Sequence, residues 1–215
     1  MQTVRIPLQQ RFVLGNVSWE DYIRISRAFG ERHLRMTYDR GVLEIMTLSF
    51  EHETISGFLG LLVITLTQEL NLPMRLGRST TLRRKPKKRG LEPDDSFWIA
   101  NEAKVRKNKR ISLRTDPPPD LTIEVDVTRS SLNRMDIYAK LRIPEVWRYK
   151  DDKLAFFTLD PAGDYIPAAV SATFPLPITP ADLMPFIQMR SQMDDNAVIR
   201  QFRAWIHSKM TPPQP

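Results

Sequence analysis

The sequence predicts an α/β protein, in which strands and helices alternate along 215 residues. Apolar residues at spacings of three and four follow Ser49 and are typical of a helix with one buried face. Apolar residues at every second position from Leu121 to Val127 indicate a strand. Because neither an internal repeat nor a linker divides the chain, we expect a single domain over residues 1–215.

The first half of the chain begins with a short helix, because Ser18-Trp19-Glu20-Asp21 resembles a capping box. Alternating residues on both sides of Asp39-Arg40-Gly41 then predict a hairpin. Ser49 can cap the long helix that follows. In order, the expected elements are a helix at residues 18–29, strands at 34–38 and 42–46, a helix from Ser49 to before Pro73, and strands at 74–82 and 96–99 with a basic loop between them.

The second half begins with three prolines at 117–119, which exclude a helix and precede a strand. Ser130 or Ser131 can cap the next helix. The expected elements are a strand at 121–127, a helix from residue 130 or 131 to about 141, a hairpin with strands at 145–149 and 154–159, an irregular Pro-rich segment at 161–185, and a helix at about 194–208.

Composition excludes several classes of protein. The chain has no Cys, which rules out disulfides, zinc–thiolate sites and iron–sulfur clusters. Its longest uncharged stretch, residues 54–68, is shorter than the roughly 18 apolar residues that a membrane span requires. The N-terminus lacks the apolar segment of an export signal, so we expect a cytoplasmic protein that does not contact membranes.

Two short basic runs account for the net charge of +7. Residues 83–89 carry six cationic side chains and residues 104–110 carry five, while the rest of the chain holds 21 basic and 25 acidic residues. A polyanion such as a nucleic acid is therefore an expected partner, although solvated loops would have the same composition. The candidate nucleic-acid-binding residues of the first run are Arg83, Arg84, Lys85, Lys87, Lys88 and Arg89.

Several common catalytic motifs are absent, including the phosphate loop, the dinucleotide fingerprint, the serine nucleophile elbow and the zinc motif H-E-x-x-H. What remains is a set of carboxylates. Asp94 stands directly before a short strand, and Glu124 interrupts an apolar strand. Buried acids on neighbouring strands are costly unless a cation lies between them. Hard oxygen ligands favour Mg²⁺ or Mn²⁺. The alternatives to a metal-binding role are that Asp94 is a turn residue and that Glu124 is an acid on the exposed face of an edge strand.

Two residues at the start of the long helix are further candidates. Glu51 precedes Ile55 by four residues and Leu59 by eight, which predicts that it shares their buried face and can be a third metal ligand. Alternatively, it is a first-turn acid that stabilises the helix dipole. His52 follows it directly and is a candidate for either a catalytic or a structural role.

An ordered set of short motifs resembles a known family. The motifs are GVLEIM at 41–46, SFEH at 49–52, EPD at 92–94, PDLTIEV at 119–125, Tyr138 and IPEVW at 143–147. Over residues 18–160 this order resembles the Uma-type restriction endonucleases of the PD-(D/E)xK nuclease superfamily. The resemblance implies a restriction-endonuclease-like fold, with a mixed β-sheet flanked by helices and a nuclease core at about 18–160. It also implies that Asp94 and Glu124, with Glu51 as a third acid, bind the metal for phosphodiester hydrolysis.

The sequence departs from this pattern at its cationic residue. The superfamily motif implies a Lys two residues after the second acid, where this chain has Asp126. In many members of the family the Lys lies instead four residues before a Tyr, and here that position is Arg134. Arg keeps the positive charge but cannot act as a base. Lys140 is an alternative cation about 120° round the helix, and Asp126 is either a further ligand or a surface acid. We favour Arg134.

Three hypotheses about function follow. The first is a Mg²⁺-dependent endonuclease that hydrolyses DNA. The sequence leaves its oligomeric state open, and a homodimer is one possibility. The second is a nucleic-acid-binding protein with a nuclease fold and a degraded active site, because Arg134 and Asp126 stand where Lys is expected. The third is an interaction module whose basic runs contact an acidic protein, and it predicts no salt-dependent affinity for DNA.

Overall fold

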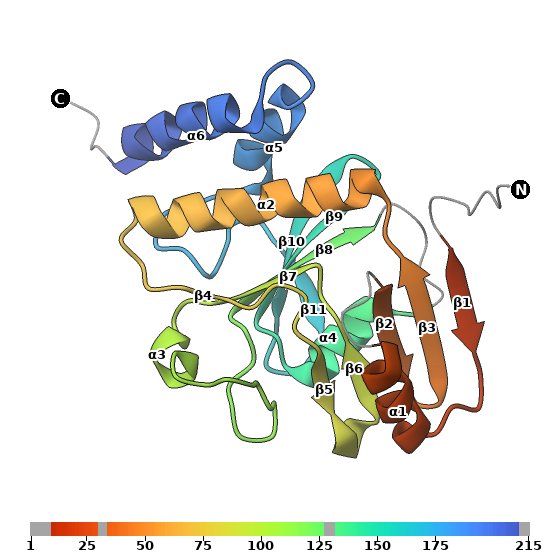
Figure 1. The fold of residues 1–215 in the computed structure, drawn as a ribbon. Coiled ribbons are helices and arrows are strands. Elements are labelled where there is room, and N and C mark those ends of the chain that lie inside the picture. Colours follow the sequence, from red (N-terminus) through yellow and green to blue (C-terminus); the bar gives the residue numbers. More distant parts are fainter. Residues whose placement is uncertain (1–9, 30–33, 127–131, 211–215) are drawn as a thin grey trace, which may run out of the picture.

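The computed structural model describes residues 10–29, 34–126 and 132–210. Helices and strands alternate along these segments (Figure 1). In chain order, the elements are β1 (Arg11–Leu14), α1 (Trp19–Phe29), β2 (Leu34–Asp39), β3 (Val42–Thr47), α2 (Phe50–Glu69), β4 (Arg75–Leu76), β5 (Leu82–Arg84), the 3₁₀-helix η1 (Lys85–Lys87), β6 (Arg89–Leu91), β7 (Asp95–Trp98), α3 (Glu102–Val105), β8 (Leu121–Asp126), α4 (Arg134–Leu141), β9 (Glu145–Lys150), β10 (Lys153–Leu159), β11 (Tyr165–Ala168), α5 (Pro180–Met189) and α6 (Asp195–Met210).

The strands form two sheets. The smaller sheet has five strands in the order β1-β3-β2-β6-β5, and all its neighbours are antiparallel. The larger sheet has six strands in the order β11-β10-β9-β8-β7-β4. Within it β8 and β9 are parallel, since a crossover containing α4 connects them, and the other described pairs are antiparallel. The predicted mixed sheet flanked by helices is therefore confirmed, with a second sheet beside it.

Helices α2 and α4 cover opposite faces of the larger sheet. The alternating residues Leu121, Ile123 and Val125 of β8 pack into the main core with α2. Glu124 points to the other face, where the Tyr138 hydroxyl of α4 donates a hydrogen bond to it. The period of two along β8 thus separates an apolar face from a face that carries a carboxylate.

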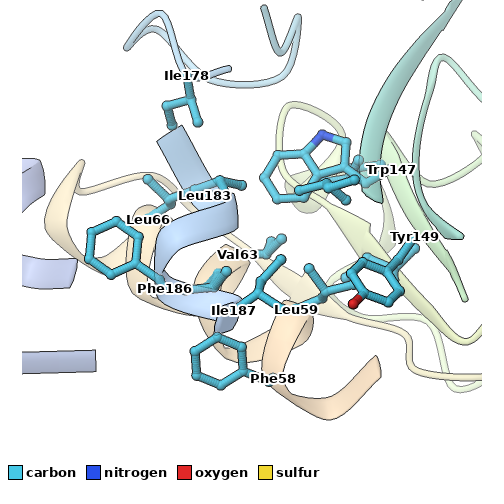
Figure 2. Close-up of a cluster of buried hydrophobic side chains, with 14 of the residues drawn as sticks. Phe58, Leu59, Val63, Leu66, Trp147, Tyr149, Ile178, Leu183, Phe186 and Ile187 are labelled. Carbon is cyan, nitrogen blue, oxygen red and sulfur yellow. The ribbon is translucent and has the colours of Figure 1, made fainter. Parts of the chain in front are cut away.

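The main core lies between α2, the larger sheet and α5. Figure 2 shows Leu66 of α2 beside Phe186 of α5 at the left of the cluster, with Trp147 of β9 at its upper right. Trp147 also stacks on Phe156 of β10, with ring centroids 4.4 Å apart. Helix α6 packs along α2 on the outer side of this core (Figure 1). The 20-residue α2, roughly 30 Å long, is therefore held on both sides.

The smaller sheet has a core of its own on the face covered by α1. Tyr22 of α1 stacks on Tyr38 of β2 with ring centroids 4.7 Å apart, and both side chains are buried. The opposite face of this sheet meets α4, because Leu82 of β5 and Leu91 of β6 share a cluster with Ile137. Helix α4 thus lies between the two sheets.

Several elements differ from those expected. The strand expected at 74–82 is divided into β4 and β5, and the expected basic loop is a hairpin made by β5, η1 and β6. The segment at 161–185 is not wholly irregular, since it contains β11 and the start of α5. Strand β1 and the short α3 were not expected. The caps expected at residues 130 and 131 lie outside the described residues, and α4 begins after Asn133.

Within the described residues, no helix is both long enough and apolar enough to cross a membrane.

Candidate functional site

Asp94 is fixed at the junction of two strands of the larger sheet. It directly precedes β7, and its backbone N–H donates to the carbonyl oxygen of Ile123 in β8 at 3.2 Å. Its side-chain Oδ2 accepts a hydrogen bond from the backbone N–H of Val125 at 2.7 Å. The side chain is only 2% exposed. Asp94 therefore holds a buried carboxylate beside the neighbouring strand β8.

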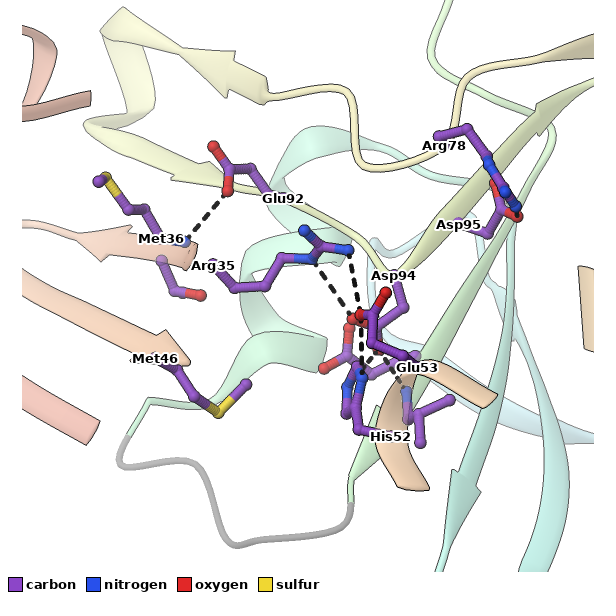
Figure 3. Close-up of polar contacts among 12 residues, drawn as sticks. Arg35, Met36, Met46, His52, Glu53, Arg78, Glu92, Asp94 and Asp95 are labelled. Atoms are coloured by element: carbon purple, nitrogen blue, oxygen red, sulfur yellow. Dashed lines mark hydrogen bonds and ion pairs between the residues drawn. The ribbon is translucent and has the colours of Figure 1, made fainter. Parts of the chain in front are cut away.

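Two cationic groups from other elements face Asp94 (Figure 3). The Nε2 atom of His52, in the first turn of α2, lies 3.3 Å from Oδ2, and the Nε atom of Arg35, on β2, lies 3.7 Å from Oδ1. Burial alone would raise the pKa of Asp94, but its contact with His52 and the charges of His52 and Arg134 lower it. The same ion pair raises the pKa of His52 in spite of burial.

Glu124 has a different set of partners, and those among the described residues come from α4. Arg134 forms an ion pair with Oε1 through Nε and donates from Nη2 to Oε2 at 2.8 Å. The hydroxyl of Tyr138, one helical turn later, donates to Oε2 at 2.6 Å. Burial raises the pKa of Glu124 to about 7, against the charge of Arg134 and with a smaller contribution from the charge of Asp94. The carboxylates of Glu124 and Asp94 therefore repel each other.

Arg134 also connects α4 to the smaller sheet. Its Nη1 atom donates to the hydroxyl of Thr37 on β2 at 2.5 Å, and Nη2 donates to the carbonyl oxygen of Glu92 at 3.0 Å. Burial would lower the pKa of Arg134, but the charge of Glu124 raises it well above its ordinary value. Arg134 is therefore a permanent cation within a buried network.

A cavity of about 230 Å³ opens beside Glu124 and Arg134. On the same strand face as Glu124, Asp126 accepts hydrogen bonds from Arg148 at 2.8 and 2.5 Å. Lys150 of β9 adds another cation to the wall. The full lining comprises Glu124, Asp126, Leu132, Asn133, Arg134, Met135, Arg148 and Lys150. The lining therefore holds three cationic side chains against two carboxylates, Glu124 and Asp126, which are paired with Arg134 and Arg148.

The donor chemistry fits a hard divalent cation, because Asp94 and Glu124 are buried carboxylates on paired strands and repel each other. Mg²⁺ commonly uses one or two carboxylates and completes its shell with water and phosphate oxygens. No cluster of three His, Asp or Glu side chains suited to a metal occurs among the residues that the structure describes. Arg134 already contacts both oxygens of Glu124. The two acids are therefore candidate metal ligands, and each faces a guanidinium in this structure: Arg35 faces Asp94, and Arg134 faces Glu124.

The structure brings together Asp94, Glu124, Arg134 and His52, and it places Asp126 on the cavity wall. The expectation for Glu51 was wrong: its side chain is exposed, and the buried residue is its neighbour His52. The buried stripe of α2 passes through His52, Ser56 and Leu59, and Glu51 lies about 100° away from His52.

Two other candidates also lie elsewhere. Lys140 is half exposed, and its Nζ atom lies 3.7 Å from Asp136, one turn earlier on α4. Arg89 was expected to bind nucleic acid, but this is wrong, because its side chain is buried and donates to Asp39 and Asp136 at 2.8 Å each. A buried guanidinium bonded to two carboxylates does not reach a ligand.

Sequence reasoning did not identify Arg35, Thr37 or the role of Tyr138. Arg35 and Thr37 alternate with Met36 and Tyr38 along β2, so a period of two places them on the face opposite α1. That alternation was visible in the sequence. What it could not indicate is that this polar face meets Asp94 and Arg134, which lie 59 and 97 residues away along the chain.

The mixed sheet flanked by helices has a fold of the restriction-endonuclease-like class. The chain belongs to the Uma2 family, whose model, described as "Putative restriction endonuclease", matches residues 19–188. The fold is similar to a crystal structure titled as a "putative nuclease belonging to DUF820" from Anabaena variabilis. The TM-score is 0.56 with 15% identity, and the match covers 80% of this chain and 99% of that chain. No curated protein matches the sequence.

Proposed function

We propose that this protein is a metal-dependent endonuclease that hydrolyses phosphodiester bonds of DNA. The observation that carries the proposal is the pair of buried carboxylates, Asp94 and Glu124, with Arg134 bound to Glu124 at the wall of a cationic cavity. Buried acids with perturbed pKa values beside a cavity are typical of catalytic sites. Membership of the Uma2 family supports nuclease chemistry.

Asp94 and Glu124 would hold the metal, Mg²⁺ or Mn²⁺, which supplies Lewis acidity and an activated water when bound. Arg134 remains protonated throughout and can stabilise negative charge on a phosphate at the cavity. Tyr138 keeps its proton as well, because burial and the charge of Glu124 raise its pKa well above its ordinary value. Its role is to orient Glu124, while Lys150 and Arg148 attract the flanking phosphates.

A second candidate function is nucleic-acid binding without cleavage. The observation that favours it is the charge balance of the site, in which Arg35 faces Asp94 and Arg134 faces Glu124. Two guanidinium groups neutralise two carboxylates without any metal, and Arg134 contacts both oxygens of Glu124. In this function the nuclease fold would be retained as a binding scaffold.

Cleavage of supercoiled plasmid and of single-stranded circular DNA separates the two functions. We expect the wild type to nick DNA with Mg²⁺ or Mn²⁺ but not with EDTA, and Asp94→Asn to abolish nicking. The matched control is Asp194→Asn, an exposed acid whose side chain caps α6 and whose replacement retains that cap. No metal-dependent cleavage by the wild type, together with salt-dependent DNA binding, would refute the first function and support the second.

A further inference from the structure

A second basic feature lies away from the candidate active site. It is a groove of about 830 Å³ lined by α1, by the hairpin that contains β5 and η1, and by residues 112–114. We call it the α1 groove. Its lining residues are Trp19, Glu20, Ile23, Arg24, Arg27, Arg83, Arg84, Lys85, Pro86, Lys87, Ser112, Leu113 and Arg114.

The lining of the α1 groove is strongly cationic. Seven of its thirteen residues are Arg or Lys, and Glu20, which pairs with Lys85 at 3.3 Å, is its single acid. Among the described residues, five of the seven form no ion pair. They are Arg27, Arg83, Arg84, Lys87 and Arg114, and they come from α1, β5, η1 and the 112–114 segment. Cations from four segments that converge without counter-charges indicate an anionic ligand.

Two features favour nucleic acid over an acidic protein. Five of the seven cations are Arg, whose planar fork matches the phosphate group in a bidentate way. The groove also has apolar walls from Trp19, Ile23 and Leu113, which suit sugars and base faces. A chain of regularly spaced phosphates with apolar groups between them matches both features.

The α1 groove and the candidate active site, at Arg134, lie on opposite faces of the smaller sheet. Thr37 of β2 faces Arg134, whereas the next residue, Tyr38, stacks on Tyr22 of α1. On β5, Leu82 packs with α4, while Arg83 lines the α1 groove. Side chains alternate between faces along each strand, so the sheet itself separates the two sites.

We propose that the α1 groove binds the phosphate backbone of a nucleic acid at a place remote from the phosphate to be cleaved. This inference rests on the proposed function, because it takes nucleic acid as the substrate class. It adds Arg24, Arg27 and Arg114 to the candidates of the basic run. Their contribution is to hold the strand and set affinity, not to participate in the chemistry.

Binding measured in EDTA tests the proposal without any need for cleavage. The probes are a fluorescein-labelled duplex and the matching single strand, titrated by anisotropy over a range of salt concentrations. The test variant combines Arg24→Ala, Arg27→Ala and Arg114→Ala. The matched control combines Lys153→Ala, Arg200→Ala and Lys209→Ala, three exposed cations that lie outside the groove and outside both basic runs. Both variants should keep the melting temperature, because exposed charges contribute little to stability.

We expect the test variant to bind at least about tenfold more weakly and to lose up to about 2.7 units of the log–log salt slope for duplex, or about 2 for single strands. The control should change the affinity far less. An unchanged slope for both probes would overturn the proposal. The proposal would also be overturned if poly-glutamate bound as tightly as DNA and the test variant lost that binding, since the groove would then be a site for acidic proteins.

The failure of this inference can be distinguished from the failure of the proposed function. If the wild type cleaves DNA and the test variant retains its salt slope, the α1 groove is not a backbone site although the nuclease assignment stands. If the test variant loses affinity and the wild type never cleaves, the groove is a backbone site on a protein that binds without cutting. The charge reversal Arg27→Glu provides a second variant with the same expectations.

Discussion

Arg134 combines three contacts that a Lys at the same position could not make together. Its three nitrogens reach Glu124, the hydroxyl of Thr37 and the carbonyl of Glu92. A guanidinium presents five N–H donors in a fixed plane, whereas an ammonium is a single point charge. Where the resemblance implies a Lys, Arg therefore gives up a group that can lose its proton and gains a link between α4 and the smaller sheet.

This difference predicts the behaviour of substitutions at Arg134. We expect Arg134→Lys to retain or raise cleavage, because it introduces the residue that the resemblance implies, and to lower stability slightly through the lost contacts to Thr37 and Glu92. Arg134→Ala should lower cleavage by about 10²-fold or more, the scale of one lost transition-state charge contact. Rates and melting temperatures of both variants should be measured together. Lys140→Ala is the control and should be nearly silent; a larger loss in Lys140→Ala than in Arg134→Ala would refute the assignment.

The ion pair between His52 and Asp94 predicts a pH window of stability. The pKa of Asp94 is lowered from 3.8, so its contribution is present above that value and is lost as the pH falls. The pKa of His52 is raised from 6.5, so its contribution is present below that value and is lost as the pH rises through the folded-state pKa. The difference in unfolding free energy between wild type and His52→Gln should be largest at about pH 5.5 and smaller at about pH 8.5. A difference that does not vary with pH would contradict a charged pair. Urea titrations at the two pH values provide the measurement.

Single residues could be predicted from the sequence where a local pattern singled them out. Asp94 directly precedes a short strand, Glu124 interrupts an apolar strand, and Arg134 precedes Tyr138 by one helical turn, so each carried a signal in its own segment. Glu51 was placed wrongly because α2 is buried around most of its circumference, which makes the phase of an apolar stripe ambiguous. Arg35 could not be assigned, since its partner lies on another sheet.

At the scale of elements, α2 is held by polar contacts at both of its ends. At its start, the Ser49 side chain accepts a hydrogen bond from the backbone N–H of His52 at 3.2 Å, which fixes the turn that faces Asp94. At its other end, Glu69 pairs with Arg203 at 3.2 Å and with His207 at 2.6 Å, both on α6. The position of His52 thus depends on how α2 is seated on the sheet.

Two glycines of α2 predict opposite responses to the same substitution. A Cβ at Gly57 would meet nothing within 4 Å, so Gly57→Ala should stabilise the protein by up to about 1 kcal/mol through helix propensity. A Cβ at Gly60 would lie 2.8 Å from Oδ2 of Asp95, which Arg78 also contacts. Gly60→Ala should therefore lose that gain or become destabilising. Chemical denaturation of the two variants compares them directly, and equal stabilisation would show that α2 does not need the close approach.

Elements in which the apolar pattern continues over many residues were predictable, and short or proline-containing elements were not. Strands β5 and β6 have three residues each and carry Arg83, Arg84 and Arg89, so a charge run concealed their alternation. Helix α5 begins with Pro180 and contains Pro185, which favoured an irregular segment. Thr179 and Asp182 form a capping box there, and Pro is compatible with a first helical turn. The capping box and the burial of apolar side chains therefore stabilise a helix where the prolines had favoured an irregular segment.

At the scale of the whole molecule, Arg89 connects the two layers. It extends from β6 and donates both to Asp39 on β2 and to Asp136 on α4. Removing one partner of a buried ion pair leaves charges uncompensated, which typically costs about 3–5 kcal/mol. The two acids are partly exposed here, so Arg89→Ala should lower the unfolding free energy by about 2 kcal/mol. Arg84→Ala, which removes a cation without an ion pair, is the control; equal stability of the two variants would exclude a structural role for Arg89.

The distribution of tryptophans gives this molecule a built-in optical reporter. Trp98 and Trp147 are fully buried in the larger sheet, so their emission responds to unfolding and hardly at all to surface ligands. Trp19 lines the α1 groove among cations that also attract iodide, an anionic quencher. Trp19 is only 9% exposed, and the fourth tryptophan, Trp205 on α6, is half-buried and lies outside the groove, so iodide should quench both indoles in part. An unlabelled oligonucleotide should remove the part of the quenching that comes from Trp19 and leave the part that comes from Trp205. Trp19→Phe, which retains an aromatic ring beside Tyr22 and Tyr38, should remove the oligonucleotide-sensitive part and leave the unfolding transition visible through the remaining indoles.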